Sequence, residues 1–180
     1  MKKVLLFLAF GLLVFSCKDK VQVKSATTSN DNITTTMNLP YKADFPVDWN
    51  SNVSDADFKM VLMSYKDWEN NNMEGLSKAM GDSVTYDNAI GLSQRLSNAA
   101  LMQQWKTNRD SLSSAEITMR SWNKMYSPST KDAFVVVWYD EKDTYKDGRV
   151  DLANYHDINQ VKDGKIVWFV QYKRPLKLPK

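Results

Sequence analysis

The segment DAFVVVWYDEKDTYKDGRVDLANYHDINQVKDGKIVWFVQYKR, residues 132–174, decides the fold, because apolar and polar side chains alternate in it around two Asp-Gly pairs. Alternation with a period of two is typical of a β-strand that buries one face. An Asp-Gly pair between two such runs is a strong signal for a tight hairpin turn. The segment therefore predicts three antiparallel strands at residues 132–144, 149–161 and 165–174, joined by turns at 147–148 and 163–164.

Counting outward from these turns assigns each side chain to one face of the sheet. Directly opposed residues share a face, and two-residue loops place Asp157 opposite both Trp138 and Val170. We expect the more aromatic face to meet the helices, and it holds Phe134, Val136, Trp138, Ala153, Tyr155, Asp157, Trp168, Val170 and Tyr172. The other face holds Val135, Val137, Tyr139, His156, Ile158, Val167 and Phe169. A turn longer by one residue would exchange the two faces of a strand.

Helical patterns precede this sheet. Ser54 is followed by an acidic first turn and by apolar residues at helical spacing up to Asn70, which predicts a capped helix. We also expect a short helix at 73–80, a strand at 84–87, a helix capped by Ser97 and a strand at 115–126. Helices followed by antiparallel strands predict an α+β domain with its helices packed on one face of a curved antiparallel sheet.

The N-terminal residues 1–17 have the layout of a secretory signal, with Lys2 and Lys3 before an apolar run of about a dozen residues. A membrane-spanning helix needs roughly 20. The sequence VFSC at residues 14–17 resembles the lipobox of bacterial lipoproteins. That resemblance implies lipidation of Cys17 and anchoring to a membrane of the bacterial cell envelope, on the periplasmic side of the outer membrane or at the surface. The alternative is ordinary cleavage, which leaves a secreted protein with a free thiol.

The remaining chain divides by composition. Residues 18–53 comprise a polar tether up to residue 38 and an aromatic, proline-containing strap at 39–49 that we expect to pack on the domain. Residues 54–180 form one domain with a short basic tail. Loss of Lys2 and Lys3 with the signal lowers the formal net charge from +3 to +1. A nearly neutral domain is not expected to bind nucleic acid electrostatically.

A single histidine and a single cysteine narrow the possible chemistry. Neighbours on a strand point to opposite faces, so His156 and Asp157 are not expected to form a catalytic pair. Zinc sites and Ser-His-Asp hydrolases are unfavoured, and we expect neither a metal nor a cofactor.

Asp157 is the most informative candidate residue. A carboxyl group among aromatic rings is desolvated, which raises its pKa and allows it to donate a hydrogen bond as a neutral acid. The alternative is that Asp157 accepts a structural hydrogen bond in a filled core. The ring residues that we expect to contact a ligand are Tyr86, Trp105, Trp138, Tyr155, Trp168 and Tyr172.

The order of these elements resembles the nuclear transport factor 2-like fold, in its SnoaL-like branch. The stretches that carry the resemblance are YKDWEN at 65–70, MEGL at 73–76, DSVTYD at 82–87, HDI at 156–158 and KDGKI at 162–166. The resemblance covers residues 54–172 and implies a cone-shaped α+β barrel. Proteins of this fold include ketosteroid isomerases, polyketide cyclases, dehydratases and non-catalytic binding domains.

The resemblance also implies roles for individual residues. Asp87 falls at the position of the isomerases' general base, and Asp157 at that of their protonated, oxyanion-stabilising acid. The position of their partner tyrosine is occupied by Met63, which donates no hydrogen bond. Asp87 alternatively starts the turn that follows its strand.

Three functions follow from these patterns. The first is a membrane-anchored domain whose pocket binds a small apolar or aromatic ligand, with catalysis an open question. The second is an isomerase, cyclase or dehydratase that uses Asp87 as base and Asp157 as oxyanion stabiliser. The third is a protein-interaction module that forms a homodimer through the open sheet face.

Overall fold

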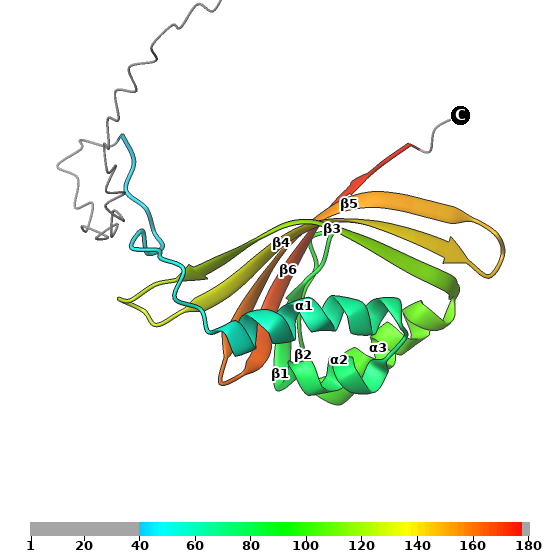
Figure 1. The fold of residues 1–180 in the computed structure, drawn as a ribbon, viewed down its shortest axis with the longest axis horizontal. Coiled ribbons are helices and arrows are strands. Elements are labelled where there is room, and N and C mark those ends of the chain that lie inside the picture. The colour runs from blue at the N-terminus through cyan, green and yellow to red at the C-terminus, as the bar shows by residue number, and fades with distance from the viewer. Residues whose placement is uncertain (1–39, 178–180) are drawn as a thin grey trace, which may run out of the picture. The chain divides into compact units, whose positions relative to one another are not determined.

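The computed structural model describes residues 40–177 (Figure 1). The predicted signal at 1–17, with Cys17, and the predicted tether lie outside these residues. Within them, no helix combines the length and apolar character needed to cross a membrane.

Three helices begin where the sequence predicts, because each has a side-chain cap. The Ser54 hydroxyl accepts a hydrogen bond from the Asp57 amide at 3.0 Å at the start of α1 (Asp55–Glu69). The Asn72 side chain does the same for α2 (Met73–Ala79), and the Ser97 hydroxyl for α3 (Asn98–Asp110). The helix positions are therefore set by local polar contacts.

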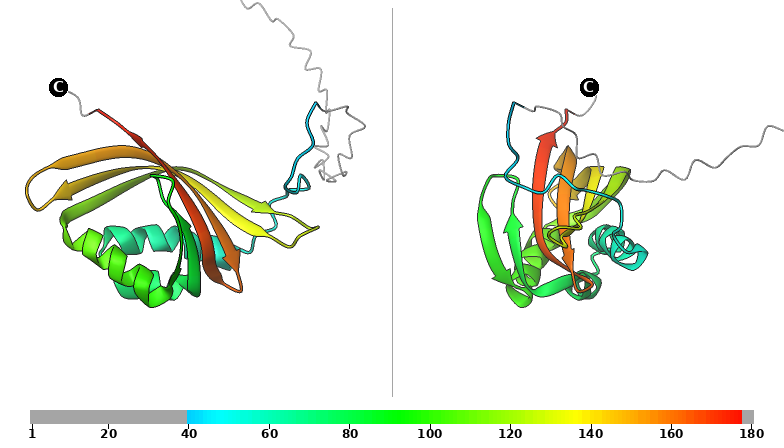
Figure 2. Two further views of the ribbon diagram at one scale, coloured as in Figure 1. Left: turned by 180° about the vertical axis from the view of Figure 1, so that it is seen from behind. Right: turned by 90° about the vertical axis from the view of Figure 1, so that its left-hand side faces the viewer.

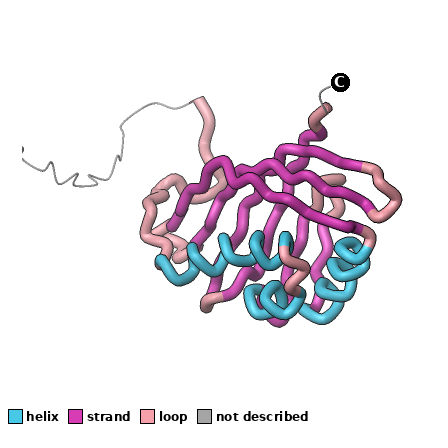
Figure 3. The backbone as a smooth tube through the Cα atoms, turned by 45° about the vertical axis from the view of Figure 1, so that its right-hand side comes forward, coloured by secondary structure: helices cyan, strands magenta, loops and turns pink. Residues whose placement is uncertain are grey.

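Six strands form one curved, unclosed sheet with the helices on one face (Figures 2 and 3). They are β1 (Met80–Asp87), β2 (Ser93–Ser97), β3 (Leu112–Tyr126), β4 (Ala133–Tyr145), β5 (Val150–Lys162) and β6 (Lys165–Pro175). Their order is β2-β1-β6-β5-β4-β3. The α+β architecture is confirmed. The sequence analysis missed β2 and the parallel pairing of β1 with β6.

The first hairpin is one residue longer than predicted. The Tyr145 amide donates to the Arg149 carbonyl at 2.8 Å, so the loop contains three residues, 146–148. Gly148 occupies the left-handed position with a φ of +87°, as a three-residue hairpin requires. Consequently Trp138 lies opposite His156, and Asp157 lies opposite Val137. The predicted pairing of Asp157 with Trp138 is wrong.

The second hairpin has the predicted two-residue loop, with Asp163 and Gly164 both at positive φ. An irregularity follows immediately, because Val161 pairs with Ile166 whereas Gln160 pairs with Trp168. This bulge shifts β6 by one residue. Asp157 therefore pairs with Gln171 and not with Val170.

These two shifts reverse the predicted faces of β4 and β6 but leave that of β5 unchanged. The interior contains Val135 and Val137, both fully buried, and Tyr139 and Phe169, which are 3% and 6% exposed. The expectation that these four residues form an open face for a second copy is therefore wrong. A homodimer as such stays a prediction.

The strap packs on the domain only at its end. Tyr41, Phe45 and Val47 are at least 80% exposed, contrary to the prediction. The Trp49 ring meets the Phe134 ring edge-on at 5.7 Å, and Asn50 forms a β-bridge with Tyr126. Contact between strap and sheet is therefore confined to the residues next to α1.

The corrected faces can be tested with one substitution made at two positions. Val137→Thr places a hydroxyl in a fully buried site and should lower the free energy of unfolding by about 2 kcal/mol. Val170→Thr, on the half-buried outer face, should change it by less than about 0.5 kcal/mol. Urea denaturation measures both values. A larger effect at Val170 than at Val137 would contradict the register described here.

Candidate ligand-binding cavity

A cavity of about 380 Å³ lies between the helices and the inner face of the sheet. This volume falls in the range of small-molecule binding sites. Eight aromatic rings line it: Tyr65, Trp68, Tyr86, Trp105, Tyr139, Tyr145, Tyr155 and Phe169. Three carboxyl groups also line it: Glu141, Asp143 and Asp157. Among the described residues, no Lys, Arg or His contributes to the lining.

Contacts between rings hold the walls of the cavity in place. Trp105 of α3 lies edge-on to Trp68 of α1 at 6.4 Å and tilted against Phe169 of β6 at 5.6 Å. Tyr86 of β1 stacks on the same Phe169 ring at 4.4 Å. Helices and sheet thus share one aromatic cluster, which limits side-chain motion around the empty space.

Asp157 is the centre of a hydrogen-bond network in the floor of this cavity. The hydroxyls of Tyr65 and Tyr139 each donate to its Oδ2 at 3.0 Å. The phenol oxygens in turn accept from the amide groups of Asn159, at 3.1 Å, and Gln171, at 3.2 Å. In each arm of the network an amide donates to a phenol oxygen, and the phenol hydroxyl donates to the carboxylate. The Asp157 Oδ1 atom has no hydrogen-bond partner.

Burial outweighs these hydrogen bonds in setting the charge of Asp157. Desolvation raises its pKa to about 7, whereas the hydrogen bonds from Tyr139 and Tyr65 act to lower it. The same burial, with the Asp157 charge nearby, raises the pKa values of Tyr65 and Tyr139 well above their usual range. Asp157 is therefore a group that gains or loses a proton close to neutral pH.

Glu141 and Asp143 form a second acidic centre on β4. The Glu141 carboxyl accepts a hydrogen bond from the Trp68 indole at 2.6 Å, and the buried Oδ1 atom of Asp143 has no hydrogen-bond partner. Burial, followed by the Asp143 charge, raises the pKa of Glu141 to about 8. Burial also raises the pKa of Asp143. Because the pKa of Glu141 is about 8, the pair holds a proton at neutral pH.

The structure brings four of the predicted site residues together. Tyr86, Trp105, Tyr155 and Asp157 all line the cavity. Asp87 does not line it: its neighbour Tyr86 faces inward, and Asp87 accepts a hydrogen bond from the Trp168 indole at 2.8 Å. The expected joint action of Asp87 and Asp157 across one cavity is therefore not supported by their positions.

Three other predicted ligand contacts lie away from the cavity. Trp168 is placed beside Asp87, and Trp138 and Tyr172 flank His156 on the outer face of the sheet, with Trp138 stacked on the imidazole at 4.8 Å. This change follows from the corrected register of β4 and β6. As predicted, His156 and Asp157 point to opposite faces.

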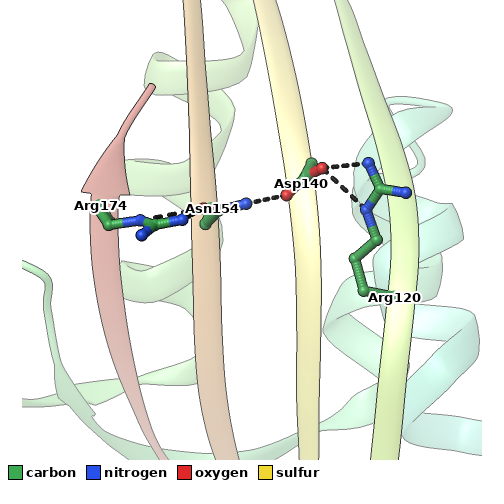
Figure 4. A network of polar contacts seen from close by, with 4 residues as sticks. All are labelled: Arg120, Asp140, Asn154 and Arg174. Carbon is green, nitrogen blue, oxygen red and sulfur yellow. Dashed lines mark hydrogen bonds and ion pairs between the residues drawn. The ribbon is translucent and has the colours of Figure 1, made fainter. Parts of the chain in front are cut away.

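The same register assembles a polar row next to these outer rings (Figure 4). Asp140 accepts from the Arg120 guanidinium at 2.8 Å and from the Asn154 amide, and Asn154 accepts from Arg174 at 3.1 Å. The row crosses β3, β4, β5 and β6. The outer face therefore differs in charge from the acidic inner face.

The sequence analysis missed several residues of the site. Met63 is half exposed, and Tyr65, two positions further along α1, supplies the phenol that donates to Asp157. Glu141 and Asp143 were overlooked as well. Tyr139, Glu141 and Asp143 are spaced by two residues along β4 and therefore share a face. The correct turn length would have placed all three on the inner face.

No group of three or more metal-ligating side chains occurs in residues 40–177.

No family model matches the sequence, and no curated protein does. Solved structures are similar in fold. An epoxide hydrolase of M. tuberculosis, described as LEH-like, shares 13% identity at a TM-score of 0.55, over 66% of this chain and 83% of that one. An NTF2-like protein of unknown function from Mesorhizobium loti shares 12% sequence identity at a TM-score of 0.52. The match covers 67% of this chain and 93% of that one. A third structure is a protein from Catenulispora acidiphila with a ketosteroid isomerase-like fold, in complex with trimethylamine. It shares 12% sequence identity at a TM-score of 0.52, over 63% of this chain and 84% of that one.

The chain therefore has the nuclear transport factor 2-like fold, as the order of its elements led us to expect. Identities of 12–13% concern the fold alone.

The pKa of Asp157 predicts how stability depends on pH. Because the folded-state pKa is raised, the unfolded chain loses this proton first, and stability falls as the pH rises from about 4 to about 7. Asp157→Asn removes this contribution and should reduce the fall by about 2–4 kcal/mol. Denaturation at pH 4.5, 6.0 and 7.5 measures it. The exposed turn variant Asp147→Asn is the control, and an unchanged pH profile in Asp157→Asn would refute the assignment.

Proposed function

We propose that this domain binds a small, largely aromatic organic molecule in the cavity between its helices and sheet. The observation that carries the proposal is a cavity of about 380 Å³ whose walls combine eight rings with a few buried polar groups. Such a combination is the usual composition of small-molecule sites, in which the rings supply affinity and the polar groups orient the ligand.

The unpartnered polar atoms support a ligand over a filled core. A buried oxygen without a hydrogen bond costs free energy that a polar ligand can recover. Asp157 leaves Oδ1 without a partner while Oδ2 accepts two phenol hydroxyls. Asp157 therefore has hydrogen-bonding capacity left for a bound molecule.

Structural neighbours are compatible with this use of the fold. The M. tuberculosis protein is an epoxide hydrolase, and the Catenulispora acidiphila protein holds trimethylamine. Both names concern small organic molecules. They support a pocket function for the present chain without identifying its ligand.

Acid–base catalysis is a second candidate function, favoured by the pKa of about 7 at Asp157. A general acid or base works best when its pKa lies near the operating pH. Met63, at the position of the isomerases' partner tyrosine, has no hydroxyl, but the Tyr65 hydroxyl donates to Asp157. Asp87 has no place in this version of the hypothesis, because it lies outside the cavity.

We further propose that the domain is held at a bacterial envelope membrane through lipidated Cys17. The basic start, the short apolar run and the lipobox-like VFSC sequence support this proposal. Two or more acyl chains give a lasting anchor, whereas one is marginal.

Narrowing the cavity should weaken binding while leaving the fold intact. Asn108 lines the cavity at the exposed end of α3, and Asn108→Trp should lower the affinity for the neutral probe 1-naphthalenemethanol at least tenfold. Thr107→Trp, the same substitution on the neighbouring exposed residue outside the lining, should leave affinity within twofold. Isothermal titration calorimetry measures both. Failure of the unmodified protein to bind both this alcohol and the corresponding amine, 1-naphthalenemethylamine, would remove the proposed function.

The anchor can be tested separately from the cavity. Cys17→Ser should move the protein from the membrane fraction to the soluble fraction of expressing bacteria and abolish incorporation of radiolabelled palmitate. Ser16→Ala retains the thiol and serves as the control. Palmitate incorporation in Cys17→Ser equal to that of the parent chain would contradict the proposal.

A further inference from the structure

We propose that the cavity selects small organic cations, in which an amine or quaternary ammonium group is carried by an aromatic or apolar body. This inference rests on the proposed function, because it names the class of molecule that the same cavity binds. Charge, ring geometry and proton linkage support it independently.

The first observation is the imbalance of charge in the lining. Glu141 and Asp157 are 6% and 3% exposed, and Asp143 lies beside Glu141. Among residues 40–177, no ion pair joins any of these three carboxyl groups to a Lys or Arg. Buried charges in proteins are normally paired. A cationic ligand would supply the missing partner.

The nearest positive groups are engaged elsewhere. The Arg109 guanidinium of α3, which lowers the pKa of Asp143 from a distance, donates to the carbonyl oxygens of Trp68 and Glu69 at 3.0 and 2.9 Å. Lys173 of β6 is exposed, and its ammonium lies 5.5 Å from the Tyr155 ring centroid. Neither group neutralises the pair by direct contact.

The second observation is the arrangement of rings around the acidic pair. The Trp68 indole donates directly to Glu141, and the Trp105 ring lies against Trp68. Burial, followed by the charges of Glu141 and Asp143, raises the pKa of Tyr155. Ring faces attract ammonium groups through their quadrupole, and more strongly where water is excluded. A lining that combines rings with carboxylates suits a cation and disfavours an anion.

The third observation is independent of the pair. Asp157 lines the same cavity from β5, and its Oδ1 has no hydrogen-bond partner although the residue is 97% buried. Its charge is among those that raise the pKa of Glu141. An added positive charge stabilises the ionised forms of both centres at once.

Proton linkage follows from the proton that Glu141 holds at neutral pH. A cation that binds between Glu141 and Asp143 displaces this proton, so binding should release protons and strengthen as the pH rises from 6 to 8. The groups that face the pair are Trp68 on α1, Arg109 on α3, Asp151 and Asp157 on β5, and Lys173 on β6. Of these, only Asp157 has a raised pKa near this range, and its ionisation acts in the same direction.

The test compares two probes that differ in charge and little in size, 1-naphthalenemethylamine and 1-naphthalenemethanol. Calorimetry with the full chain at pH 7.5 should show the amine binding at least tenfold more tightly than the alcohol. Repeating the amine titration in phosphate and in Tris should reveal proton release that the alcohol lacks. The affinity for the amine should rise between pH 6 and pH 8.

Conservative variants locate the effect. Glu141→Gln retains the oxygen that accepts from Trp68, so the fold should persist while the preference for the amine falls below threefold. Asp143→Asn is the second variant at the pair and should act similarly. Glu116→Gln removes an exposed carboxylate of the same sheet, paired with Lys142, and should leave the preference unchanged.

Each outcome decides between the two proposals. Binding of the alcohol as tightly as the amine would overturn the selection of cations and leave the proposed function standing. A preference for the amine that persists in both Glu141→Gln and Asp143→Asn would overturn the role of the pair. Failure of both probes to bind the unmodified protein would overturn both proposals.

Discussion

The three-residue loop at 146–148 is the constraint on which the rest of this structure depends. With Gly148 in the left-handed conformation, the loop sets how β4 pairs with β5. Because successive side chains of a strand point to opposite faces, this pairing turns Tyr139, Glu141 and Asp143 toward the helices. The same pairing turns Trp138 outward. The chemical character of the cavity is therefore a consequence of the length of one surface turn.

The buried carboxyl groups have different partners, and their chemistry differs accordingly. Asp157 receives two phenol hydroxyls on one oxygen, so its network stabilises negative charge that burial disfavours. Glu141 accepts a hydrogen bond from the Trp68 indole and holds a proton at neutral pH, whereas Asp143 beside it leaves Oδ1 without a hydrogen-bond partner. Asp157 is thus a hydrogen-bond acceptor with its donors already in place, whereas the Glu141 and Asp143 pair retains a proton at neutral pH. Both are destabilising at neutral pH unless something in the cavity compensates for them, because burial favours their neutral forms.

The two faces of the sheet differ in the charge of their side chains. The inner face is acidic and aromatic and surrounds an open volume. The outer face places rings beside Arg120 and Arg174, which are tied into a row with Asp140 and Asn154. A fold shared with proteins of 12–13% identity says little about either surface. Both are set by side chains, and side chains vary freely on a common backbone.

By itself, the sequence determined the features that act over a few residues: the caps at Ser54 and Ser97, the strand periodicity and the existence of both Asp-Gly hairpins. It also placed Asp157 in the interior, since the face of β5 was counted correctly. Tertiary structure alone decided which side chains join Asp157, because the loop at 146–148, the bulge near Val167 and the parallel pairing of β1 with β6 depend on packing between strands. Because side chains alternate between the two faces of a strand, a one-residue difference at a turn exchanges the faces along the whole strand. For that reason Tyr65, Glu141 and Asp143 became recognisable as site residues only in three dimensions.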